Sequence, residues 1–137
     1  AGGVGTGRTR GGAAKCLKEK NPAARAYGAG PKGSPVLSGG KAGPHGLQGI
    51  GAGFVPEILD TSLIDGVVCV TEEEAYAAAR EIARTDGVLA GISSGAAVHA
   101  ARVLAAREEN RGKTIAVVLP DTGMRYLSTA LFSEKQE

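Results

Sequence analysis

The start of the chain combines four glycines with two threonines within its first nine residues. Such a turn can bind a phosphate group, because glycine adopts positive φ and lets the backbone approach an anion, whose charge a following helix N-terminus stabilises. The candidate phosphate ligands are Gly5, Thr6, Gly7, Arg8 and Thr9. Turns of this kind normally follow a buried strand, so we expect the chain to be part of a longer protein and to begin at a strand's carboxyl end. A plain flexible terminus is the alternative.

A second candidate site lies at Ser93 and Ser94, which precede a helix of small and apolar residues expected over 96–107. Because such a helix is buried, its first N–H groups and both serine hydroxyls need partners or a ligand. We expect Ser94 to act as an ordinary N-cap. The Ser93 hydroxyl is then left for another partner.

The elements of the first half are expected to be a helix, a short strand and a long loop. Residues 10–20 have a helical pattern that ends at Asn21, which precedes a proline. Its inner face would hold Ala13, Ala14 and Leu17. Residues 24–28 would form the strand, and 31–56 a loop longer than most connections in compact domains. Long ordered loops usually carry function.

The second half contains two apolar runs typical of strands in a parallel sheet, over 67–70 and 114–119. The first run leads into a helix whose start is marked by a capping box between Thr71 and Glu74 and whose end is marked by Gly87. The second run is expected to lead into a last helix. That helix would run through Tyr126, Leu127, Ala130 and Leu131.

This order of elements predicts an α/β fold: an open, mostly parallel twisted sheet with helices on both faces, incomplete as it stands. We expect one domain over residues 1–132 and a loose tail over 133–137. Ligands bind at the carboxyl ends of the strands in such sheets. The turns at Gly5 and Ser93 would therefore converge on one small molecule.

Composition excludes several other classes of function. A net charge of +2 without a basic stripe, and only three tyrosines and two phenylalanines as aromatic residues, argue against a nucleic-acid partner. The two cysteines lack metal-ligand spacing, so we expect no metal site and a reducing compartment. No apolar run reaches the length of a membrane span, which predicts no membrane partner and a cytoplasmic protein.

Several separated segments, taken in order, resemble the C-terminal half of the cysteine synthases, or O-acetylserine sulfhydrylases, which are pyridoxal-phosphate enzymes of the β-family (fold type II). The matching segments are Gly5-Thr6-Gly7-Arg8-Thr9, Tyr27, Ser34-Pro35-Val36-Leu37-Ser38-Gly39-Gly40, Gly43-Pro44-His45, Gln48-Gly49-Ile50-Gly51-Ala52-Gly53-Phe54, Gly91-Ile92-Ser93-Ser94-Gly95 and Arg125-Tyr126-Leu127-Ser128. Any one of them would be a weak signal, whereas their ordered combination is highly specific.

The resemblance implies that the cofactor is pyridoxal 5'-phosphate, that residues 5–9 hold its phosphate and that Ser93 binds its pyridine nitrogen. A neutral hydroxyl does not hold the ring protonated as a carboxylate would, which suits β-elimination. The implied reaction is a β-replacement in which O-acetylserine loses acetate and sulfide adds to give cysteine. The residues adjacent to the substrate would be Gln48, Gly49, Gly51 and Ala52.

The resemblance also implies what the chain lacks, because the family's Schiff-base lysine and its substrate-binding asparagine loop belong to the N-terminal half. We therefore expect no catalytic residue in this chain and no activity of the chain alone. Lys15, Lys18 and Lys20 are interpreted as solvated charges. The implied partners are the missing N-terminal half, a second copy in a homodimer, and the C-terminal tail of serine acetyltransferase.

Three residues depart from the family pattern. Arg8 stands where the family has a glycine, and Gly30 and Met124 each stand where it usually has a glutamate. Loss of those charges would lower stability or cofactor affinity. His45 and His99 receive no role, since a lone histidine more often packs in a loop or on a helix. The alternatives are another β-family enzyme, such as cystathionine β-synthase or O-phosphoserine sulfhydrylase, and a non-catalytic module that binds phosphate or a partner.

Overall fold

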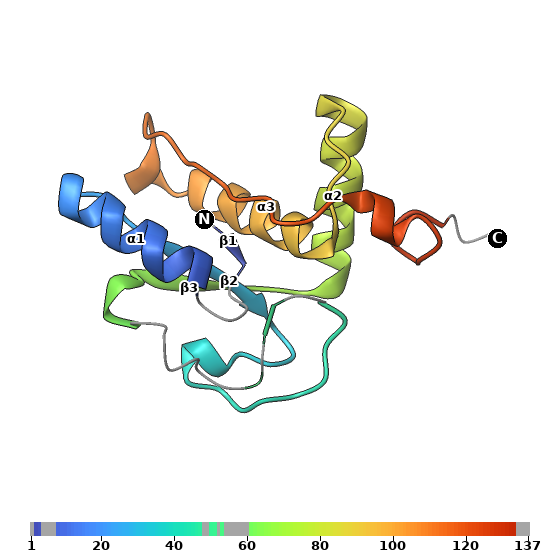
Figure 1. Cartoon of the computed structure of the whole chain (residues 1–137), viewed down its shortest axis with the longest axis horizontal. Coiled ribbons are helices and arrows are strands. Elements are labelled where there is room, and N and C mark those ends of the chain that lie inside the picture. The colour runs from blue at the N-terminus through green and yellow to red at the C-terminus, as the bar shows by residue number, and fades with distance from the viewer. Residues whose placement is uncertain (1, 4–7, 48–49, 52, 54–60, 134–137) are drawn as a thin grey trace.

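The computed structural model describes residues 2–3, 8–47, 50–51, 53 and 61–133 (Figure 1). The proposed phosphate ligands Gly5, Thr6 and Gly7 lie outside these residues, and so does the tail over 134–137.

A three-stranded parallel sheet forms the centre, with the order β1 (Gly2–Gly3), β2 (Tyr27–Pro31) and β3 (Gly66–Val70). The predicted open, parallel α/β sheet is thus confirmed, and β3 is the expected apolar strand. Strand β2 begins three residues later than expected. The N–H and the carbonyl of Ala26 both form hydrogen bonds with Asp65. The pairing of β2 with β3 therefore starts at Tyr27.

The α-helices among the described residues are α1 (Arg8–Lys20), α2 (Glu72–Asp86) and α3 (Ile92–Ala105). The capping box that begins α2 is confirmed, because Thr71 and Glu74 exchange side-chain and backbone hydrogen bonds. Gly87 ends that helix at φ 69°, as its position predicted. Short 3₁₀ helices among the described residues are Val36–Ser38, Thr61–Leu63, Glu108–Asn110 and Gly123–Tyr126.

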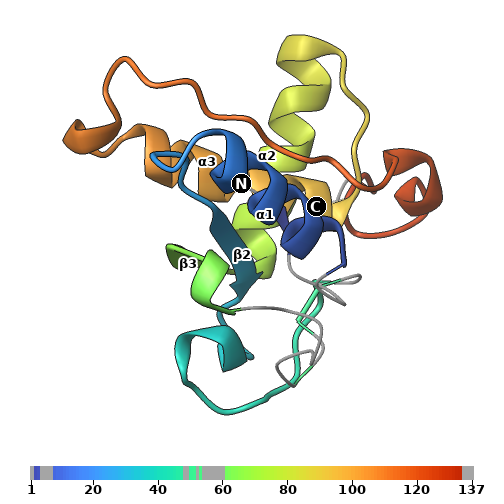
Figure 2. The ribbon, with the colours of Figure 1, turned by 60° about the vertical axis from the view of Figure 1, so that its left-hand side comes forward.

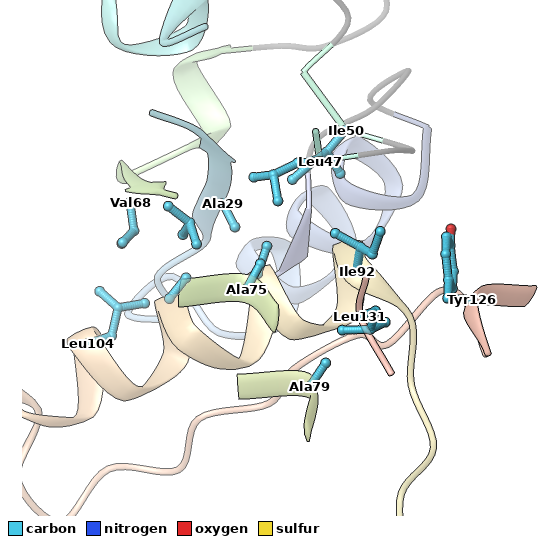
Figure 3. Close-up of a cluster of buried hydrophobic side chains, with 13 residues drawn as sticks. Ala29, Leu47, Ile50, Val68, Ala75, Ala79, Ile92, Leu104, Tyr126 and Leu131 are labelled. Carbon is cyan, nitrogen blue, oxygen red and sulfur yellow. The ribbon is translucent and has the colours of Figure 1, made fainter. Parts of the chain in front are cut away.

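Helix α3 lies against all three strands, and α2 packs along it. The two helices approach closely at Gly95, where a Cβ atom would lie 2.1 Å from the carbonyl oxygen of Ala75. Figure 3 shows part of the resulting core, with Ala29 and Val68 of the sheet facing the helices. In Figures 1 and 2 part of the loop after β2 extends away from the sheet and helices, and the loop contributes Leu47 and Ile50 to the core.

Two expected elements are absent among the described residues. Residues 114–119 form no regular structure and run alongside α3 (Figure 1). Val118 in this segment is 47% exposed. A strand needs a neighbour for its ladder, and none of the three strands pairs with this run. The prediction of a last helix is also wrong, because a 3₁₀ helix over Gly123–Tyr126 is followed by turns.

The expected inner face of α1 is only partly correct. Ala14 is buried, as predicted, whereas Ala13 is exposed and Leu17 is 58% exposed. The helix contacts the 3₁₀ helix Thr61–Leu63, and Lys18 pairs with Asp65 just beyond it, whereas Leu17 faces solvent.

Candidate functional site

Ser93 lies in the first turn of α3, which begins four residues earlier than expected. Gly91 is the N-cap, in an extended conformation, and its carbonyl accepts the N–H of Gly95. The prediction that Ser94 is the N-cap is therefore wrong. Ser94 lies inside the helix, fully buried, and its hydroxyl donates to the carboxylate of Asp121.

Ser93 is 4% exposed as a residue, and none of the described residues forms a hydrogen bond with its hydroxyl. The hydroxyl is thus available to a polar ligand atom, and one hydrogen bond contributes about 0.5–1.5 kcal/mol net. The first N–H groups of α3 also lack partners within the helix and give that end a positive dipole. A polar ligand atom held at this point fits both features.

The other half of the candidate site starts where β1 leads into α1. Arg8 and Thr9 are the first residues of that helix, and residues 4–7 connect it to the strand. A turn from a parallel strand into a helix N-terminus is the arrangement that binds phosphate. The side chains of Arg8 and Thr9 lie outside the description, as do Gly5, Thr6 and Gly7.

Of the four expected substrate-adjacent residues, only Gly51 is described; Gln48, Gly49 and Ala52 lie outside the described residues. Gly51 has φ 71°, and a Cβ atom there would lie 2.4 Å from Cγ of Pro31. Its carbonyl oxygen lies 2.8 Å from Nε2 of His45. Sequence reasoning gave His45 no role, and this contact across the loop could not be read from its spacing.

The same loop reaches the first turn of α3. Leu47 and Ile50 belong to one buried cluster with Ile92, and Figure 3 shows both beside it. Since Ile92 precedes Ser93, the structure brings the loop that carries Gly51 to the helix end that carries the buried serine. The expected convergence of the Gly5 and Ser93 turns stays a prediction, because Gly5 lies outside the described residues.

A separate pocket of about 320 Å³ lies where β2 and β3 end. Its lining residues are Pro31, Lys32, Gly33, Pro44, His45, Gly46, Leu47, Val70, Thr71 and Glu72. Ser93 does not line it, so the pocket is distinct from the start of α3.

The three lysines of α1 differ in their surroundings. Lys15 and Lys20 are exposed, as expected, whereas Lys18 forms an ion pair with Asp65 at 2.8 Å. Burial raises the pKa of Asp65, but hydrogen bonds from Lys18 and from the Ala26 N–H outweigh it and hold that pKa below its ordinary value. Lys18 is thus partnered rather than simply solvated.

The departures at Gly30 and Met124 leave room for side chains. Met124 is 69% exposed, and a Cβ atom at Gly30 would meet only Cγ1 of Val67, at 3.7 Å. Within the described residues no His, Cys, Asp and Glu side chains gather in a group that could hold a metal ion. None of the described helices is long and apolar enough to cross a membrane.

Comparison with known proteins identifies the family. Residues 1–121 match the family model described as "Pyridoxal-phosphate dependent enzyme". The chain belongs to this family. The family's cofactor is the one that the sequence motifs indicated.

Relatives within the pyridoxal-phosphate dependent enzymes include a cysteine synthase of Staphylococcus aureus, 50% identical over 131 residues, which are 96% of this chain and 42% of that protein. A solved cysteine synthase from Entamoeba histolytica is 43% identical with a TM-score of 0.94, over 98% of this chain and 40% of the other. An O-acetylserine dependent cystathionine β-synthase from Helicobacter pylori is 40% identical with a TM-score of 0.82, over 96% and 42%. The chain thus spans less than half of each.

Proposed function

We propose that this chain is the cofactor-holding portion of a cysteine synthase, which makes L-cysteine from O-acetylserine and sulfide. Membership of the pyridoxal-phosphate family and 50% identity to the S. aureus cysteine synthase support the proposal. The structural observation that carries it is Ser93 in the first turn of α3, whose hydroxyl forms no hydrogen bond with a described residue although its neighbour Ser94 bonds Asp121.

The chain would hold the cofactor at two helix N-termini. The turn into α1 would bind the phosphate through its backbone N–H groups and hydroxyls, and Ser93 at the start of α3 would bind the pyridine nitrogen. The proposed phosphate ligands are Gly5, Thr6, Gly7, Arg8 and Thr9. The positive dipole of α1 would stabilise the phosphate charge.

Pyridoxal phosphate, when bound, supplies an electron sink for the α-carbon of an amino-acid substrate. Ser93 would keep that sink moderate, because a hydroxyl does not stabilise a protonated pyridine ring as a carboxylate does. Gly51 would lie beside the substrate, in a loop that is held by the hydrogen bond between His45 and the Gly51 carbonyl. Gln48, Gly49 and Ala52 are proposed to line it beside Gly51.

The proposal assigns the Schiff-base lysine to the portion of the family fold that this chain does not match. Lys18 is engaged by Asp65, and Lys15 and Lys20 are exposed on α1. We therefore expect the chain alone to bind cofactor without turnover.

Exposed apolar side chains support the view that another polypeptide segment completes the fold. Residues 88–90 lie beside 121–123, joined by the Ala90–Thr122 bridge and by the Gly123 N–H bonded to the carbonyl of Leu89. The large exposed apolar residues on and around these segments are Val88, Leu89, Val118, Leu119, Met124 and Leu127. Burying them would be favourable by about 25 cal/mol per Å² of apolar surface.

A related reaction is the second candidate, since the solved H. pylori relative is named an O-acetylserine dependent cystathionine β-synthase. O-phosphoserine sulfhydrylase and a non-catalytic phosphate-binding module are weaker alternatives. Homodimer formation and binding of the C-terminal tail of serine acetyltransferase at the mouth of the site belong to the same proposal.

The test begins with the chain alone and pyridoxal phosphate, measured by equilibrium dialysis and absorbance. We expect saturable binding that Ser93→Ala weakens about tenfold, the equivalent of one hydrogen bond. Unchanged binding by Ser93→Ala would contradict the placement of the cofactor.

The reaction is tested in a chain extended by the unmatched portion of the S. aureus cysteine synthase. We expect formation of cysteine from O-acetylserine and sulfide. A preference for homocysteine over sulfide would favour the cystathionine β-synthase alternative.

A further inference from the structure

Asp121 is joined to the first turn of α3 although it lies 27 residues beyond Ser94 in the sequence. The Ser94 hydroxyl donates to Oδ1 of Asp121 at 2.5 Å, and its oxygen accepts the backbone N–H of Asp121 with an N–O distance of 3.5 Å. The carbonyl oxygen of Asp121 accepts the N–H of Gly91 at 3.3 Å. The side chain and the backbone of Asp121 thus both bond to residues that begin α3.

This contact requires a glycine at the N-cap. A Cβ atom on Gly91 would lie 2.0 Å from Oδ2 of Asp121 and 2.6 Å from Cε2 of Tyr126. The carboxylate therefore occupies the space directly beside the N-cap. A negative charge at this end of a helix is stabilised by the helix dipole.

The orientation of this first turn determines where the Ser93 hydroxyl points. Successive side chains on an α-helix are about 100° apart, so a small rotation of the turn redirects the hydroxyl. Ser93 itself forms no hydrogen bond among the described residues, whereas Ser94 beside it is held at Asp121. Among the described residues, the bonds of Asp121 to Ser94 and Gly91 are polar contacts that hold the turn.

We propose that Asp121 is a positioning residue for the cofactor: through Ser94 and Gly91 it holds the first turn of α3 so that the Ser93 hydroxyl meets the pyridine nitrogen. This inference rests on the proposed function. It assigns Asp121 no contact with the cofactor. The competing explanation is that the carboxylate only stabilises the helix end.

The experiment uses the 137-residue chain and pyridoxal phosphate labelled with ¹⁵N in its ring. The ring nitrogen's chemical shift reports its hydrogen bond, and equilibrium dialysis gives the affinity. Asp121→Ala removes the acceptor and the charge, whereas Asp121→Asn removes the charge and keeps an oxygen for Ser94. Ser93→Ala gives the shift of a ring nitrogen without its partner.

A matched control is Arg80→Leu. Arg80 also joins distant segments, because its guanidinium donates to the carbonyl oxygens of Ala130 and Leu131, but these bonds do not involve the first turn of α3. Arg80→Leu should lower the midpoint of thermal unfolding and leave the ring ¹⁵N shift unchanged. It therefore separates general loss of stability from loss of positioning.

We expect Asp121→Ala to move the ¹⁵N shift toward that of Ser93→Ala and to weaken binding about tenfold, while Asp121→Asn restores most of both. An Asp121→Ala chain that loses stability but keeps the wild-type shift and affinity would overturn the inference alone. A wild-type chain that binds no pyridoxal phosphate would overturn the proposed function and the role of Asp121 with it.

Discussion

Nε2 of His45 lies 2.8 Å from the carbonyl oxygen of Gly51, and this hydrogen bond joins two parts of the loop after β2. The contact depends on a backbone that only glycine adopts readily, with φ 71° at Gly51. It also depends on close packing, because Pro31 occupies the space beside that glycine. The shape of the proposed substrate loop thus follows from one hydrogen bond and one missing side chain.

The first prediction compares two glycines of this loop. Gly51→Ala should lower the free energy of unfolding by at least about 3 kcal/mol, because it combines a positive φ with overlap onto Pro31 and His45. Gly53→Ala should cost about 1 kcal/mol, since φ is 77° but the nearest atom is 3.8 Å away. Urea unfolding measures both, and equal losses would show that overlap at Gly51 is relieved.

The second prediction concerns the packing of α2 against α3. Gly95→Ala should lower the free energy of unfolding by about 3 kcal/mol, because its Cβ would lie 2.1 Å from the carbonyl oxygen of Ala75. Gly12→Ala is the control on α1: a Cβ there meets nothing within 4 Å. It should raise stability by about 0.5–1 kcal/mol through higher helix propensity. A neutral Gly95→Ala would contradict the helix contact.

The third prediction follows from the capping box of α2. The hydrogen bond from the Thr71 N–H holds the pKa of Glu74 below its ordinary value, against the effect of burial, and the charge of His99 adds to the lowering. A lowered pKa in the folded state means that this stabilisation is present above the ordinary pKa of 4.5 and is lost as the pH falls through the folded value.

The matched variant is Glu74→Gln, which keeps the side-chain acceptor of the box but cannot titrate. The wild type should be more stable by a few tenths of a kcal/mol near neutral pH, and the difference should fade as the pH falls through the lowered folded-state pKa of Glu74. Far-UV circular dichroism during urea unfolding measures it. A difference that grows on acidification would have the wrong sign for this cap.

The fourth prediction tests the exposed apolar surface around Val118. Val118→Asp should change the stability of this chain by less than about 0.5 kcal/mol, because the side chain is 47% exposed. In the chain extended by the unmatched portion of the S. aureus protein, the same change should cost about 2–4 kcal/mol if that portion buries the residue. Leu17→Asp, on the exposed side of α1, is the control.

The sequence by itself determined the family, the parallel α/β class, strand β3 and both ends of α2. These features depend on local signals, since an apolar run, a capping box and a terminal glycine need only neighbouring residues. The motif at Ser93 was likewise visible from residue types and order alone.

Tertiary structure decided the rest, because it depends on contacts between distant residues. Serine is a residue type that is favoured at the N-cap, yet Gly91 is the N-cap of α3. Ser94 lies inside the helix, where its hydroxyl bonds Asp121. Residues 114–119 have the composition of a strand and do not form one, because a ladder requires a neighbouring strand that no described residue supplies. Local sequence fixes which conformations are favourable, and the partners available in space select among them.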